Sequence, residues 1–73
     1  MKGFEILITS PPDRKKLVAE IWHNDILVAE INQEKENLEI GFYLNEKIKF
    51  DLDEFLKAAE NAKGKIRNFQ TDK

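Results

Sequence analysis

A chain of 73 residues, of which 41% are hydrophobic and 36% charged, is long enough for one small domain over residues 1–73 and too apolar for a disordered segment. It contains no cysteine, which excludes a disulfide framework and a thiolate zinc site. The formal net charge of −2 gives no overall attraction to nucleic acid or to an anionic membrane. Without a signal-type start or a membrane-length apolar run, the sequence predicts a cytoplasmic protein with no membrane partner.

The first expected element is a β-strand over residues 3–9. Phe4, Ile6 and Ile8 fall on one face because successive strand side chains point to opposite sides. The prolines Pro11 and Pro12 then remove two backbone donors, so the strand must end before them.

A repeated pentapeptide predicts a β-hairpin. Leu-Val-Ala-Glu-Ile occurs at 17–21 and again at 27–31, with turn-prone residues between the copies, so strands are expected over 16–23 and 26–33. A two-residue loop at Asn24 and Asp25 would pair Ala19 with Glu30 and mix polar with apolar residues on both faces. A three-residue loop at 23–25 would pair Ile21 with Leu27 and Ala19 with Ala29, giving one apolar face, and is favoured for that reason.

A further strand is expected over 37–44, where apolar residues alternate with Glu39, Gly41 and Tyr43. Gly41 indicates a bulge or a close approach of another group. Ile48 and Phe50 leave two interpretations open, a short fifth strand over 47–50 or a lead into the next element.

That next element is an amphipathic helix expected over 52–68. Asp51 is a good N-cap, Glu54 completes a capping box, and Phe50 and Phe55 stand at the positions of a hydrophobic staple. Gly64 is expected to end or bend the helix, followed by a tail over 69–73. One apolar stripe consists of Leu52, Phe55, Leu56, Ala59, Ala62, Ile66 and Phe69. The predicted fold is therefore α+β, an antiparallel meander of four or five strands with one C-terminal helix on one face.

The residues needed for catalysis or for binding a metal or cofactor do not come together in this sequence. The single histidine, His23, is expected to be a solvent-facing turn residue without metal co-ligands. Glu20 and Glu30 are expected to lie diagonally on an open sheet face. Carboxylates need a cleft to act as an acid and base pair, and such a face provides none. Residues 33–37 have the composition of a solvated loop. No catalytic, cofactor or metal site is predicted, and the chain is not expected to be an enzyme.

The outward face of the sheet carries the predicted protein interface. One helix cannot cover both faces of a sheet, so large apolar residues on the far face would stay exposed and would favour burial against a second copy or another protein. These residues are Val18, Trp22, Ile26, Val28 and Tyr43.

The general pattern of the chain resembles that of small bacterial immunity proteins. The segments that carry this resemblance are the two Leu-Val-Ala-Glu-Ile strands, the strand Leu38–Tyr43 and the helix 51–63. The resemblance implies a non-catalytic, inhibitor-like protein-binding module whose partner is a toxin. The alternative hypothesis is a small nucleic-acid-binding domain that uses Trp22 and Tyr43 with Arg14, Lys15 and Lys16. The net negative charge and the neighbouring glutamates oppose that alternative.

Overall fold

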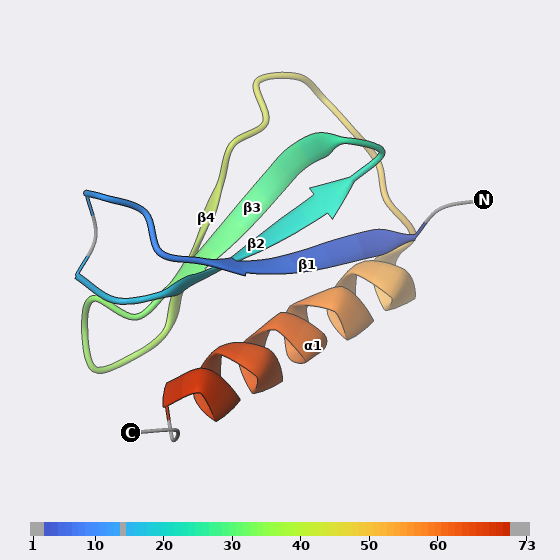
Figure 1. The fold of residues 1–73 in the computed structure, drawn as a ribbon. Helices are drawn as coiled ribbons and strands as arrows, with labels where there is room; N and C mark the ends of the chain where they lie inside the picture. The colour runs from blue at the N-terminus through green and yellow to red at the C-terminus, as the bar shows by residue number, and fades with distance from the viewer. Residues whose placement is uncertain (1–2, 14, 71–73) are drawn as a thin grey trace.

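The computed structural model describes residues 3–13 and 15–70, which form one four-stranded antiparallel sheet and one helix. The strands lie in the order β1–β2–β3–β4, so each pairs with its neighbour in sequence, and the helix α1 lies against one side of the sheet (Figure 1). The elements are β1 (Phe4–Thr9), β2 (Val18–His23), β3 (Ile26–Asn32), β4 (Glu39–Phe42) and α1 (Leu52–Gln70). Arg14, residues 71–73 of the predicted tail and the side chain of Phe69 lie outside the described residues.

The predicted α+β class is confirmed, with four antiparallel strands in an open sheet and a C-terminal helix. Residues 47–50 carry no strand, so of the two interpretations the segment leads into the helix. The prediction for Gly41 is wrong. It pairs with Glu30 in a continuous β3–β4 register without a bulge, and no described atom lies within 4 Å of the position that a Cβ would take.

The β2–β3 hairpin differs from the predicted one in its loop. Asn24 and Asp25 both have positive φ, 52° and 66°, and connect His23 directly to its partner Ile26. Two successive left-handed residues are typical of a two-residue type I′ loop, whose twist suits a hairpin. A register shift then leaves Val28 without an opposite residue, so that Ile21 pairs with Ala29 and Ala19 with Ile31. A three-residue loop was expected because it gives one apolar face. The structure has such a face with a two-residue loop, because the bulge shifts the register.

The helix begins as its sequence predicts. The backbone N–H of Glu54 donates to the Asp51 carboxylate at 3.0 Å, and the rings of Phe50 and Phe55 stack with centroids 6.4 Å apart. Gly64 neither ends nor bends α1, which continues to Gln70. Ile66, one turn later, is completely buried, and its packing holds the helix together beyond the glycine.

The core lies between α1 and the strands β1, β2 and β3. The helix contacts β1 and β2, and Ala58, Ala62 and Ile66 are its buried residues. They pack in one cluster with Ala19, Ile21, Val28, Ala29 and Ile31 of the hairpin. Small alanines on the helix allow its backbone to approach the sheet closely. Within the described part of the chain, α1 lacks the long apolar stretch that crossing a membrane would require.

Candidate functional site

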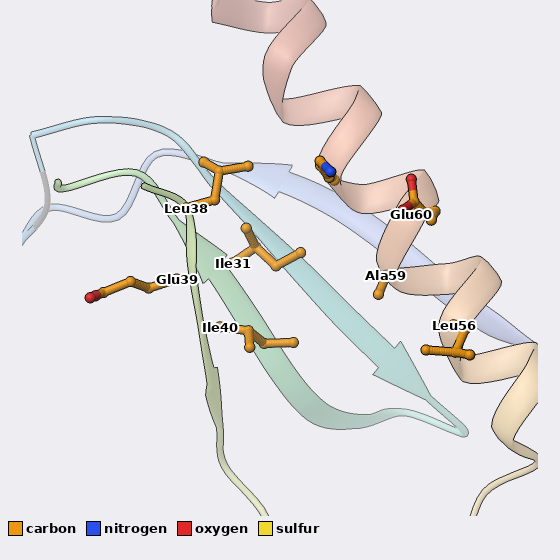
Figure 2. Close-up of a pocket in the computed structure, with 8 residues that line it drawn as sticks. Ile31, Leu38, Glu39, Ile40, Leu56, Ala59 and Glu60 are labelled. Atoms are coloured by element: carbon orange, nitrogen blue, oxygen red, sulfur yellow. The ribbon is translucent and has the colours of Figure 1, made fainter. Parts of the chain in front are cut away.

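An apolar groove runs between α1 and the β3–β4 half of the sheet, and we call it the α1–β4 groove. It encloses about 480 Å³. Its sheet side is formed by Ile31, Leu38, Glu39 and Ile40, and its helix side by Leu56, Ala59, Glu60 and Lys63. Figure 2 shows Ile31 and Ile40 directed toward the helix side of the sheet, while Leu56 and Ala59 project from α1, which lies to their right in the view. The groove is therefore built from residues far apart in sequence.

The groove exists because one helix is too narrow for this sheet. An α-helix with its side chains is about 10–12 Å across, whereas neighbouring strands lie about 4.8 Å apart, so one helix covers roughly two strands. Because α1 lies over β1 and β2, and Ala29 and Ile31 of β3 are still buried beside it, the same face of β4 is left open (Figure 1). Ile40 and Phe42, the residues of β4 on this face, are exposed as a consequence.

Large apolar side chains remain in contact with solvent along this open face. Ile40 and Phe42 of β4 are 42% and 60% exposed, and Leu52 and Leu56 of α1 are 68% and 51% exposed. Among the ring contacts of the described residues, Phe42 has one with the helix: its ring centroid lies 6.1 Å from that of Phe55. The alternation predicted for residues 37–44 puts Ile40 and Phe42 on one face of the strand, but it did not reveal that the helix leaves them half covered.

Charged residues of both signs stand at the edge of the groove. Glu60 and Lys63 lie on the helix side, one turn apart, and Glu39 lies on the sheet side. Lys35 and Glu39 form an ion pair at 3.4 Å, with side chains that are 75% and 49% exposed. Such an exposed pair contributes little to stability, so both partners can exchange it for others at small cost.

At the other end of the helix, aromatic rings form a cluster that includes His23. Its ring lies 4.7 Å from that of Phe4 and 5.1 Å from that of Phe50, measured between centroids. The prediction of a solvent-facing turn histidine is therefore wrong: His23 is the last residue of β2 and is half-buried against two aromatic rings. Its role is to pack the start of β1 against the segment that leads into α1.

On the opposite face of the sheet, two carboxylates lie side by side. Glu20 and Glu30 are directly opposed across β2 and β3 rather than diagonal, because the bulge shifts the register by one residue. Directly opposed like charges destabilise a sheet. The Trp22 indole N–H donates to Glu20 at 3.0 Å and the Tyr43 hydroxyl donates to Glu30 at 2.6 Å, and these charge-assisted bonds offset the repulsion.

The residues of the predicted outer-face interface are not all on one surface. Val18 and Val28 are 0% and 1% exposed and so are buried within the monomer. Ile26 pairs with His23 and shares its side of the sheet, since the bulge reverses the predicted alternation. Trp22 and Tyr43 remain on the outer face, next to the two glutamates. Whether these two rings contact a partner stays a prediction.

Gln33 was missed by the sequence analysis, which placed it in a solvated loop. Its side chain is 4% exposed, and its amide donates to the Leu17 carbonyl at 2.9 Å. This bond joins the end of β3 to the residue before β2, so it fixes the hairpin where the ladder stops. Composition gives no signal for it, because glutamine is usually exposed.

Among the described residues, no group of three or more His, Asp or Glu side chains is arranged to hold a metal ion. Arg14, one of the three basic residues of the nucleic-acid hypothesis, lies outside the described residues, and Lys15 and Lys16 are exposed. The rings of Trp22 and Tyr43 stand beside Glu20 and Glu30, whose charge is unfavourable for a phosphate backbone.

Comparison with protein-family models, curated proteins and solved structures found no match for this chain. The resemblance to immunity proteins therefore stays a prediction from the sequence pattern. The geometry of the α1–β4 groove is the feature from which a function can be argued.

Proposed function

We propose that this chain is a non-catalytic protein-binding module that works in the cytoplasm and uses the α1–β4 groove as its binding surface. The observation that carries the proposal is the exposure of large apolar side chains at the groove: Ile40 and Leu56 line it and are 42% and 51% exposed. Phe42, two residues after Ile40 in β4, and Leu52, one turn before Leu56 in α1, are 60% and 68% exposed. Contiguous exposed apolar patches with a polar edge are typical of protein interaction sites.

The sheet edge supports the same proposal. β4 is an edge strand, and its four residues are exposed, so the backbone groups on its free side have no strand beside them among the described residues. Open edges favour association with another chain unless they are protected. A partner that enters the groove would cover this edge as well as the apolar side chains. An inhibitor or immunity-type role belongs to the same class, and Glu34, Glu36 and Glu39 would give such a partner an acidic surface to recognise.

The proposal is tested with three forms of the chain as bait for proteins of its own cell. Leu56→Asp places a charge in the groove, and Leu7→Lys is the control, because Leu7 lies in β1, is 52% exposed against 51% for Leu56, and pairs with Glu20, which a lysine does not repel. Proteins retained by the wild type and by Leu7→Lys should be lost from Leu56→Asp. Circular dichroism of each variant checks that it is folded. If Leu56→Asp retains the same proteins as the wild type, the groove is not the binding surface.

A further inference from the structure

The free edge of β4 presents backbone hydrogen-bonding groups beside the α1–β4 groove. The Tyr43 N–H donates to the Val28 carbonyl of β3 at 2.9 Å. Backbone groups point alternately to the two sides of a strand, so those of Gly41 and Tyr43 face β3 in the continuous β3–β4 ladder. Those of Ile40 and Phe42 face the free edge instead, where the described part of the chain places no further strand.

These edge groups distinguish between the kinds of partner that the groove could bind. A helix that lies over β4 would bury the N–H and C=O groups of Ile40 and Phe42 without pairing them, and burying a backbone group without a hydrogen bond is unfavourable. An extended segment beside β4 bonds to all four groups and brings its own side chains to the groove. The groove and the edge together therefore favour a strand.

We propose that the α1–β4 groove binds an extended segment of another protein, which adds to β4 as an antiparallel fifth strand of the sheet; the inference rests on the proposed function and names the partner. Two residues of the segment exchange hydrogen bonds with Ile40 and Phe42, and their side chains lie on the helix side of the sheet. Leu56 projects from α1 toward the groove (Figure 2). Long apolar side chains such as leucine are needed to reach across Ile40 toward it.

The outer side of β4 defines the rest of the segment. Because strand side chains alternate, its other residues lie on the outer face, opposite Gly41 and Glu39. No described atom lies within 4 Å of the position that a Cβ of Gly41 would take, and an aromatic side chain on a neighbouring strand covers such a glycine. Glu39 is half exposed, and its exposed ion pair with Lys35 can be exchanged for a basic residue opposite it. From its N-terminus, the segment therefore has the order apolar, aromatic, apolar, basic.

The opposite edge of the sheet does not offer the same surface. β1 is also an edge strand, but the side of α1 next to it carries Glu54, Lys57 and Asn61. A strand added there would place its inward side chains against charged and amide groups. At β4 the helix side of the groove includes Leu56 and Ala59 beside its charged residues, so the apolar side chains of an added strand have apolar neighbours on the helix at this edge.

Isothermal titration calorimetry of the full chain with synthetic peptides tests the proposal. The probe is the capped peptide Thr-Leu-Tyr-Leu-Lys-Thr, which the wild type should bind saturably with a dissociation constant below about 1 mM. N-methyl groups on both leucines remove the donors that face Ile40 and Phe42 and should weaken binding by about tenfold or more. N-methyl groups on the tyrosine and the lysine point away from β4 and should leave the affinity nearly unchanged, which makes this peptide the matched control.

Variants of the chain test whether the peptide binds at β4. Leu56→Asp and Glu39→Lys should each weaken binding about threefold to tenfold, and Leu7→Lys on β1 should bind as the wild type does. A peptide with glutamate in place of its lysine should bind Glu39→Lys more tightly than the original peptide does. Circular dichroism checks that each variant is folded.

The proposal is overturned if the wild type shows no saturable binding up to about 1 mM peptide. Equal affinities of the two methylated peptides overturn it as well, because a helix would lose binding from both and a contact through side chains alone from neither. A wild type that sediments as a dimer, with Leu56→Asp a monomer, would place a second copy in the groove and also exclude the added strand.

The protein-binding function is judged separately, by the proteins that the chain captures from its own cell. If the peptide does not bind but these proteins are still lost from Leu56→Asp, the groove binds another protein and only the added strand is excluded.

Discussion

Asp51 illustrates how one side chain determines where an element begins. Its carboxylate accepts the Glu54 N–H at 3.0 Å, which satisfies one of the helix N–H groups that have no partner within the helix. Because this bond depends on a nearby short acceptor and on local spacing alone, the sequence was sufficient to predict it.

Replacing Asp51 with alanine should lower the free energy of unfolding by roughly 0.5–2 kcal/mol, because the N-cap hydrogen bond is lost while the core is unchanged. Urea denaturation measures the difference. Asp51→Asn is the control, since asparagine retains an oxygen acceptor and should stay close to the wild type. A loss equally large in both variants would mean that the charge near the helix start, rather than the hydrogen bond, provides the stabilisation.

His23 and Gln33 show the limit of prediction at the residue scale. For both residues, the residue type and the neighbouring sequence predict exposure to solvent. In the structure, however, His23 is half-buried against Phe4 and Phe50, and Gln33 is buried with a hydrogen bond to the Leu17 carbonyl. Both environments are created by residues distant in the chain. Local pattern carries no information about such neighbours, so these two assignments could not be obtained from sequence alone.

At the scale of elements, the common apolar face of the β2–β3 hairpin was predicted correctly, but the length of its loop was not. The sequence requires the two Leu-Val-Ala-Glu-Ile segments to place their apolar residues on a common face. That requirement can be met by the length of the loop or by a bulge next to it. The structure uses a two-residue loop with the bulge at Val28, which also exchanges the faces of Ile26 and Leu27.

Whether replacing Gly64 raises or lowers the free energy of unfolding depends on where the helix α1 ends. Gly64 lies inside the helix with an ordinary negative φ, and no described atom is within 4 Å of its would-be Cβ. Gly64→Ala should therefore raise the free energy of unfolding by about 0.5–1 kcal/mol, because alanine loses less backbone entropy in a helix interior.

The measurement for Gly64→Ala is again chemical denaturation, with the helical content followed by circular dichroism. If the glycine instead terminated the helix with a positive φ, as the sequence suggested, alanine would be strained there and the variant would be less stable. A decrease in stability would thus show that α1 does not continue to Gln70.

At the scale of the whole molecule, the α+β class and the order of elements could be predicted because each strand and the helix have their own periodicity. The location of the exposed apolar surface could not. Its position depends on which strands α1 covers, and that choice follows from the fit of Ala58, Ala62 and Ile66 against the sheet. The comparison of one helix width with four strands was the available signal that part of the helix side must stay open.

Trp22, the only tryptophan, reports which face of the sheet a partner covers. It lies on the face opposite to the α1–β4 groove, where its indole N–H donates to Glu20. If association uses the groove, acrylamide quenching of Trp22 fluorescence should be the same in the associated wild type and in Leu56→Asp, because the outer face stays in contact with solvent in both. If association instead uses the outer face that the sequence analysis favoured, Trp22 becomes shielded, and its quenching constant falls as the associated fraction rises. The two faces are on opposite sides of a single sheet, so one interface cannot cover both, and the quenching result identifies which of them is occupied.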